Sequence, residues 1–535
     1  MKRLVQFIIA LTASASVGAH TAGDSLLLRD FTFVAAASPW LTTGNAAALT
    51  VFASKSITRA EATAQYASGN FTDYYESRRT FTAGGTAESF FRLNRTTVLY
   101  GSMSYENYNG HAMTGSAFID PTHRPFDIVE DSLCNPGRKH RDTYRLSGAV
   151  GIDVWKGLSV GARADFTAAN YAKYKDLRHK NKLMDLNVRA GLMWHAGTFA
   201  VGANYVYHRN TETITFNTYG KADRTYNSLI NYGVFMGMVE QFGIDGYTDK
   251  SREMPLLDEK HGGALQAEWK PVPQLSLFSE MQITHSHGYY GRKSPFTVTY
   301  TKHHANAYDY HGRITWNRLS ARHLLDVSIA AENLENGENP HREMKNAAGA
   351  TYYEYYAPVK TANKVWVNTA VSYTGFYGIE HELPRWTVGL SLNLMHRKQT
   401  AYQFPYYRRQ KISSAEITAQ CARNFHIGRG TLKAALTAAY KKGSGEPSED
   451  LLFVAPSDKQ TAPATMEAFL EQEYLYHTSP QYRIGGSIRY SFRFPGTPLA
   501  TFAALSVDHH RRNGRRSDYI GITNTAYAIS IGCTF

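Results

Sequence analysis

The chain has 535 residues, of which 43% are hydrophobic and 13% aromatic, and it carries a formal net charge of +13. A mean hydropathy of -0.40, with no apolar run beyond the amino terminus near the ~20 residues that a spanning helix needs, excludes a helical membrane protein. The three widely spaced cysteines exclude a disulfide framework and a zinc site of the usual spacing.

The amino terminus predicts export. Lys2 and Arg3 are basic, residues 4–11 are apolar, and most of residues 16–19 are small. This is the pattern of a signal peptide that spans residues 1–19. Residues 20–57 follow as a periplasmic or lumen-plugging segment, in which Phe33 and Trp40 offer large apolar side chains for packing. Residues 58–535 are expected to form one domain, because they contain no linker.

This long region predicts β-strands, because apolar and polar residues alternate over the ~9–11 residues that a tilted membrane-spanning strand needs. Residues 184–194 and 386–394 alternate clearly, with apolar side chains at every second position. About 18 strands are expected, with 16 to 20 as the range, and they begin or centre near residues 58, 84, 96, 143, 158, 182, 198, 260, 274, 306, 321, 363, 385, 411, 429, 482, 498 and 519.

The connections between these strands are of two kinds. Tight turns are expected at residues 155–157, 196–197, 317–318 and 494–496, and long polar stretches near residues 107–140, 212–259, 335–361, 443–480 and 511–518. Short periplasmic turns and long extracellular loops are typical of outer-membrane barrels. Residues 464–476 would break this order as a strand, and their apolar spacing predicts a short helix in an extracellular loop instead.

The final strand supports the same architecture. Tyr527, Ile529, Ile531 and Cys533 share one face, and Phe535 ends the chain. An apolar stripe that ends in an aromatic residue closes many barrels against lipid. The sequence therefore predicts an all-β protein, a transmembrane antiparallel β-barrel in the outer membrane, with surrounding lipid and the barrel-assembly machinery as partners of the last strand.

Barrels of 16–18 strands leave an aqueous lumen, so the expected function is passage or capture of a small solute. Opposed basic and acidic side chains in a lumen orient polar solutes and select by charge. Pairing between strands, which would only stiffen the wall, is the alternative for each of them. The candidate lumen-lining residues are Arg145, Asp153, Arg163, Asp165, Arg189, Glu280, Asp326, Glu332, Arg483, Arg489 and Arg493.

Other chemistries are less well supported by the sequence. Pairs such as His285 and His287 would share a strand face and suit iron, haem or another metal, but surface histidines are the favoured explanation, and no cofactor is expected. No serine and histidine stand in a spacing that indicates a nucleophile, so no enzyme is expected. The basic residues are spread along the strands, which favours a cationic lumen or rim and not nucleic-acid binding.

Short motifs support a resemblance to a known family. The segments 38–41 (Ser-Pro-Trp-Leu), 44–49 (Gly-Asn-Ala-Ala-Ala-Leu) and 87–102 make the chain resemble a family of outer-membrane β-barrels of unknown function from Bacteroidota. Residues 45–49 are also similar to the Asn-Pro-Ala-Gly-Leu of long-chain fatty-acid transporters, with alanine at the Pro and Gly positions. The resemblance implies an outer-membrane location beside nutrient-uptake partners.

Two functions therefore remain open. The first is a barrel for solute uptake, with a TonB-dependent receptor or a surface lipoprotein as candidate partner. The second is a structural or accessory barrel that docks a surface lipoprotein or a secretion component. Tyrosine-rich loops at residues 352–356 and 402–409 are candidate docking surfaces or lids.

Overall fold

The computed structural model describes residues 29–535 except 131–134, 220–225, 242–253, 295, 429, 494–498 and 515–516. The expected signal peptide and the expected turn at residues 494–496 lie outside the described residues. None of the described helices is long and apolar enough to cross a membrane.

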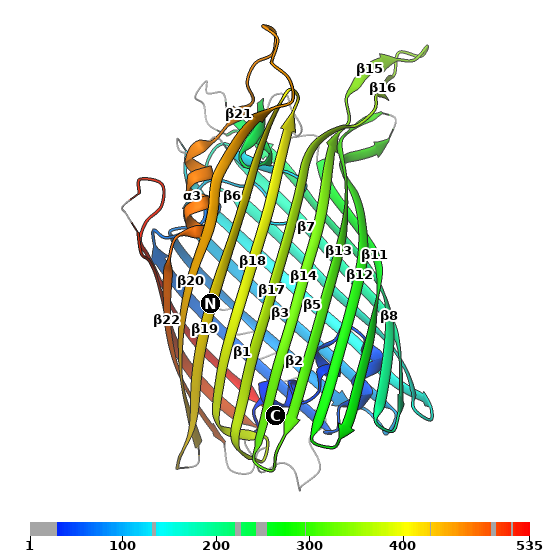
Figure 1. Ribbon diagram of the computed structural model, residues 1–535, viewed down its shortest axis with the longest axis vertical. Coiled ribbons are helices and arrows are strands. Elements are labelled where there is room, and N and C mark those ends of the chain that lie inside the picture. Colours follow the sequence, from blue (N-terminus) through cyan, green and yellow to red (C-terminus); the bar gives the residue numbers. More distant parts are fainter. Residues whose placement is uncertain are drawn as a thin grey trace.

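Eighteen antiparallel strands form one closed sheet (Figure 1), which confirms the predicted fold and each of the predicted strands. The barrel closes where β1 pairs with β24 over the register Arg59–Thr534 to Gly69–Asn524. The strands of the barrel are β1 (Ser56–Gly69), β2 (Arg79–Arg92), β3 (Thr97–Met113), β5 (Gly137–Trp155), β6 (Leu158–Lys173), β7 (Arg178–Ala196), β8 (Phe199–Asn217), β11 (Met254–Val272), β12 (Leu275–Ser294), β13 (Thr297–Asn317), β14 (Ala321–Glu338), β17 (Val359–Glu380), β18 (Leu383–Gln403), β19 (Tyr406–Ile427), β20 (Gly430–Leu452), β22 (Gln481–Arg493), β23 (Ala500–Arg512) and β24 (Thr523–Thr534).

The two ends of the barrel differ. At one end, here the turn end, short connections such as residues 156–157, 197–198 and 381–382 join the strands. At the opposite, loop end, most connections are long, and β15 (His341–Lys345) and β16 (Thr351–Tyr355) form a hairpin that projects beyond the rim (Figure 1). The expected loop at residues 402–409 is wrong, because β18 and β19 continue through it to a two-residue connection.

The barrel is much taller on one side. Strands β17 to β20 have 22, 21, 22 and 23 residues, whereas β22, β23 and β24 have 13, 13 and 12. Since ~9–11 residues suffice for a tilted strand to span a bilayer, the longer strands extend well beyond that thickness.

An N-terminal segment, residues 29–54, packs against the inner wall at the turn end (Figure 1). It contains α2 (Phe31–Ala35) and the 3-10 helices η1 (Pro39–Thr42) and η2 (Ala46–Val51). Asp30 caps α2 by accepting hydrogen bonds from the amides of Thr32 and Phe33, and Pro39 suits the first turn of η1 because it needs no donor there.

Loop residues form a second structure at the loop end, here the cap. It consists of a four-stranded sheet, β4 (Asp127–Glu130), β9 (Asn227–Gly233), β10 (Met236–Gln241) and β21 (Ala464–Thr465), together with helix α3 (Glu467–Thr478). The helix confirms the short helix expected near residues 464–476. The sheet corrects the expectation that residues 107–140 and 212–259 are plain loops, because β4 and β9 are buried on both faces, with side chains in two apolar clusters.

Candidate functional site

A cavity of about 330 Å³, here the chamber, lies against the lumen face of the wall between the N-terminal segment and the cap. Strands β14, β17, β18, β19 and β20 supply its lining. Register pairing aligns these residues across the strands, since Ser328 opposes Ala370 and Asn393 opposes Glu416. The polar residues of the lining are Ser328, Asn368, Asn393, Ser414, Glu416 and Lys441.

Two opposite charges of the chamber stand next to each other without pairing. Glu416 and Lys441 face each other across β19 and β20, yet no ion pair joins their side chains. The Lys441 ammonium instead lies 5.8 Å from the ring centroid of Tyr476 in the cap helix. The chamber thus presents a carboxylate, an ammonium and two amides, a set that suits a small polar solute.

The cap is attached to the wall above the chamber through α3. The buried guanidinium of Arg397 donates from Nη1 and Nη2 to the two carboxylate oxygens of Glu473 at 2.9 and 2.8 Å, and from Nη2 to Gln410 at 2.8 Å. Arg408 donates from Nη1 to Glu467, at the start of the same helix, at 2.9 Å. These charge-assisted bonds fix the orientation of α3 over the wall.

A buried charge cluster attaches the other part of the cap. Glu130 on β4 pairs with Lys139 of β5 at 2.6 Å and also with Lys173 of β6, and all three are almost fully buried. Burial raises the pKa of Glu130, but the charges of Lys139 and Lys173 outweigh it and lower this pKa to about 2. The cap strand and the two wall strands are therefore held by one shared carboxylate.

A second buried acid of the cap, Asp127, has a raised pKa and not a lowered one. Burial raises the pKa of Asp127 to about 6, although its carboxylate accepts hydrogen bonds from Ser116 Oγ at 2.5 Å and Tyr74 Oη at 3.0 Å. The hydroxyl donors lower the pKa only in part, because neither carries a charge.

Cap stability should therefore fall as the pH rises through about 6. The pKa of Asp127 is higher in the folded protein than its ordinary 3.8, so its contribution is fully present below pH 3.8 and is lost above pH 6. The difference of roughly two units corresponds to about 3 kcal/mol. Hydrogen exchange of β4 and β9 at pH 5 and pH 8 measures the part that is lost above pH 5, about 1.4 kcal/mol. Asp127→Asn should remove the pH dependence, and an equal dependence in that variant would contradict the assignment.

The N-terminal segment is anchored to the opposite side of the wall by buried polar bonds. Trp40, 1% exposed, donates from Nε1 to Glu268 at 2.8 Å and packs edge-on against Phe278. Asn45 donates to the carbonyl of Leu192 at 2.9 Å. A Cβ on Gly161 would lie 2.2 Å from the backbone nitrogen of Ala47, so only glycine lets η2 approach this strand.

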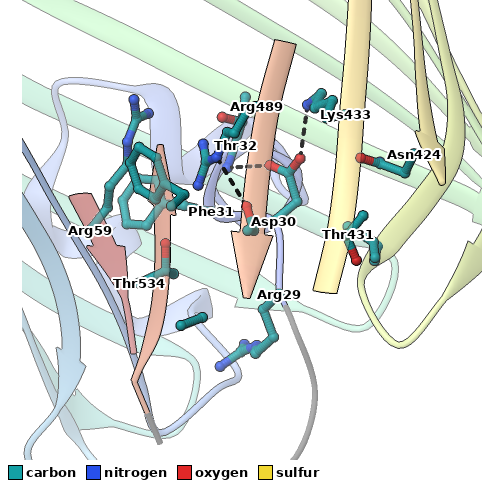
Figure 2. A pocket seen from close by; sticks show the side chains of 14 residues that line it. Arg29, Asp30, Phe31, Thr32, Arg59, Asn424, Thr431, Lys433, Arg489 and Thr534 are labelled. Carbon is teal, nitrogen blue, oxygen red and sulfur yellow. Dashed lines mark hydrogen bonds and ion pairs between the residues drawn. The ribbon is translucent and has the colours of Figure 1, made fainter. Parts of the chain in front are cut away.

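Ion pairs attach the start of the same segment, and they surround a small cavity of about 40 Å³ (Figure 2). Lys433 of β20 reaches Asp30 at 3.1 Å, and Arg29 pairs with Glu382 in the turn between β17 and β18. Burial raises the pKa of Asp30, but the charge of Lys433 and the amide of Phe33 outweigh this and lower it overall. We call the Asp30–Lys433 and Arg29–Glu382 pairs the latch.

Several residues expected to line the lumen lie beside the N-terminal segment. Arg489 borders the latch cavity and stacks over Phe502, with its guanidinium 3.6 Å from the ring centroid (Figure 2). A Cβ on Gly44 would overlap the guanidinium of Arg189. Glu280 accepts a hydrogen bond from Gln266 at 2.9 Å, and Asp153 accepts one from Ser159 at 2.6 Å.

The other expected residues are mostly paired within the wall. Arg163 bonds Asp165 at 2.9 Å, and Glu332 lies 3.6 Å from His123 and 3.8 Å from Lys260. Arg145 is exposed and Arg493 half-buried. The candidate arginines of β22 have different surroundings, because Arg483 pairs with Asp508 while Arg489 lies at the latch. The remaining pairs are Arg313–Asp326 at 2.6 Å, His311–Asp326 at 2.9 Å and Arg483–Asp508 at 3.1 Å.

Sequence reasoning missed the chamber and the latch. Asn393 was visible as a polar residue in an alternating strand, but Asn368, Glu416 and Lys441 come from strands whose polar positions carry no pattern of their own. The latch was missed because Asp30 and Lys433 lie 403 positions apart in the sequence. Among the described residues, no group of three or more His, Cys, Asp or Glu could hold a metal ion.

Comparison with known proteins gives a family and a set of distant structures. The profile of a family of unknown function, DUF6850, matches residues 46–535. None of the curated proteins matches the chain in sequence. Among solved structures, BauA, the ferric preacinetobactin receptor from Acinetobacter baumannii, is similar with 9% identity and a TM-score of 0.40, over 89% of this chain and 80% of that one.

Two further solved structures are similar at the same level. The ferric citrate transporter FecA in the unliganded form has 10% identity and a TM-score of 0.38, over 90% of this chain and 79% of that one. The ferric-catecholate import receptor Fiu from E. coli K12 has 9% identity and a TM-score of 0.39, over 89% and 81%. At these scores the likeness assigns neither a substrate nor a partner to this chain.

Proposed function

We propose that this chain, which belongs to the DUF6850 family of unknown function, is an outer-membrane barrel that takes up a small polar solute. The solute enters the chamber from the loop end and leaves past the N-terminal segment at the turn end. The loop end is then extracellular and the turn end periplasmic, as in other outer-membrane barrels.

The outer surface of the wall supports the membrane location. Outward positions of β18 are apolar from Trp386 to Leu394, and Leu390 is 51% exposed in the isolated chain. Exposed apolar side chains repeat on neighbouring strands, for example Ile417 on β19 and Ile484 on β22. A continuous apolar band around a closed barrel is stable in lipid and unfavourable in water. The sequence of the amino terminus and of the last strand supports export and insertion by the barrel-assembly machinery.

The chamber carries the proposal of uptake. It is a polar cavity inside a barrel, between two separate obstructions, the cap and the N-terminal segment. Its side chains offer donors and acceptors at Asn368 and Asn393 and unpaired charges at Glu416 and Lys441. A structural barrel has no need of such a cavity, and a permanently open pore has no need of the two obstructions.

The latch is the proposed control point at the periplasmic end. Asp30 both caps α2 and pairs with Lys433, so loss of the ion pair loosens the start of the segment while its first helix stays capped. The ion pair between Asp30 and Lys433 is only partly buried. Its contribution to the attachment of the segment is therefore small, about 1 kcal/mol or less. A contact of this size permits release of the segment without unfolding of the barrel.

Solute entry into liposomes that contain the purified protein tests this role. Asp30→Asn should increase the entry rate of small polar solutes severalfold, because asparagine still caps α2 but cannot pair with Lys433. Lys433→Gln should act in the same direction. Lys433→Arg is the matched control, which keeps the charge and should leave the rate unchanged. Equal rates in all four proteins would contradict a gate at the latch.

A second candidate is a structural or accessory barrel that docks a surface lipoprotein or a secretion component. An exposed aromatic cluster at the loop end favours it, in which the rings of Tyr407 and Phe453 lie 4.6 Å apart and Phe404 is 63% exposed. Exposed aromatic side chains beyond the membrane band are typical of protein contacts. A protein that never conducts in planar bilayers, but binds such a partner through Phe404, would favour this second function.

A further inference from the structure

Three lysines lie on the outer surface of the tall wall, directly above its apolar band. Outward positions of β18 are apolar up to Leu394 and then continue with His396 and Lys398. On β19 the apolar Ile417 is followed toward the loop end by Lys411, and on β20 the outward Tyr440 is followed by Lys442. Residues of the opposite parity, such as Arg397, face the lumen, where Arg397 contacts the cap.

Two of these lysines repel each other. Lys398 and Lys411 are direct cross-strand partners, so their Cβ atoms lie within roughly 5 Å of each other, an arrangement that destabilises a sheet when both residues carry the same charge. A shift of one residue in this register would separate the two lysines but would also turn the apolar face away from the membrane. The pair therefore needs an anion to be favourable.

Among the described residues, no acidic side chain forms an ion pair with Lys398 or Lys411. Glu446 stands opposite Lys411 in the register, but no ion pair joins them. The acids one step further toward the loop end are already paired, because Arg409 binds Glu449 at 2.5 Å and Arg408 binds Asp450 at 2.6 Å. Lys398, Lys411 and Lys442 thus present three ammonium groups without an acidic partner.

We propose that Lys398, Lys411 and Lys442 bind the phosphate groups of a phosphorylated glycolipid in the outer leaflet of the membrane. The phosphates would lie between the ammonium groups, and the acyl chains would lie on the apolar side chains below, including Leu394 and Ile417. Lysines at the level of the head groups attract anionic lipid in this way. The site rests on the membrane location proposed above and is independent of the chamber and of any transported solute.

Lipid retention by the purified protein tests the site. The protein in detergent is mixed with lipid A that carries two phosphates, and the bound fraction is measured by native mass spectrometry. Lys398→Gln with Lys411→Gln should weaken binding about tenfold or more, which is the loss expected when two charges near a membrane surface are removed. Adding Lys442→Gln should weaken it further.

Controls separate this site from general attraction and from a site for free anions. Lys156→Gln with Lys175→Gln removes the same charge from exposed positions elsewhere, and this variant should bind like the wild type. Dephosphorylated lipid A should bind weakly to all variants, and millimolar inorganic phosphate should not displace the lipid. Equal binding by the Lys398 and Lys411 double variant, or displacement by inorganic phosphate, would overturn the proposal.

The membrane location is checked separately in the same preparations. A folded barrel migrates differently on gels before and after boiling, and each variant must show this shift. If the wild type shows no shift and stays soluble without detergent, the membrane location fails. If the shift is present but lipid binding does not depend on the lysines, only the lipid site fails.

Discussion

Deleting residues 29–54 should convert a barrel with little conductance into one with large, steady open steps in planar bilayers. The N-terminal segment touches the wall on several sides, since Phe33 packs on β14 and β17, Trp40 on β8 and β12, and Phe52 on β2. A segment with contacts so far apart crosses the lumen. Its removal should raise single-channel conductance about tenfold or more, because an 18-stranded barrel otherwise encloses a water-filled interior.

A point variant and a control keep this result interpretable. Gly161→Leu should raise conductance as well, because its side chain would displace Ala47 and with it η2. The control deletes the projecting hairpin of residues 341–355, which lies at the loop end outside the lumen. This control should conduct like the wild type. Unchanged conductance in both the deletion and the Gly161→Leu variant would mean that the segment does not block the lumen.

Glu130→Gln should destabilise the cap by about 3–5 kcal/mol, the usual loss when one partner of a buried charge cluster is neutralised. Lys139 and Lys173 would then remain buried without the carboxylate that pairs with both of them. The pKa of Glu130 is about 2 in the folded protein against an ordinary 4.5, so its contribution is complete above pH 4.5 and is lost as the pH falls toward 2. Hydrogen exchange of β4 and β9, measured at pH 7, should report the loss.

Glu449→Gln is the matched control for this variant. Glu449 also pairs with an arginine, but its side chain is 50% exposed, so its loss should cost at most about 1 kcal/mol. The Glu130→Gln variant should differ least from the wild type near pH 2, where the wild-type carboxylate is itself half protonated. If both variants weaken the cap equally at pH 7, burial of the Glu130 cluster does not determine its strength.

The sequence predicted the fold well where the two faces of a strand meet different surroundings. Each barrel strand has lipid-type and lumen-type positions in alternation, so the period-two pattern of residues such as Leu390 and Asn393 identified the strand and its two faces. Helix α3 followed from the same pattern by exclusion, because a strand there would have reversed the order of turns and loops. Both inferences use only local residues.

The cap and the latch could not be predicted in this way. Strand β9 (Asn227–Gly233) is buried on both faces, so its apolar side chains show no alternation that would distinguish it from a loop. Charges such as Glu130 and Asp30 find their partners only when distant strands close around them. The same limit applies to the arginines of β22, because strand length separates Arg483, which pairs with Asp508, from Arg489 at the latch cavity.

The unequal height of the wall decides from which direction the cap can be reached. Strand β20 has 10 residues more than β22, which in a tilted strand corresponds to roughly 20 Å of additional height. A large molecule that approaches along the barrel axis therefore contacts the high rim at β17 to β20 before it can reach the low rim at β22 to β24. If the loop end faces outward, as proposed above, a small molecule that approaches parallel to the membrane reaches the cap over the low rim at β22 to β24.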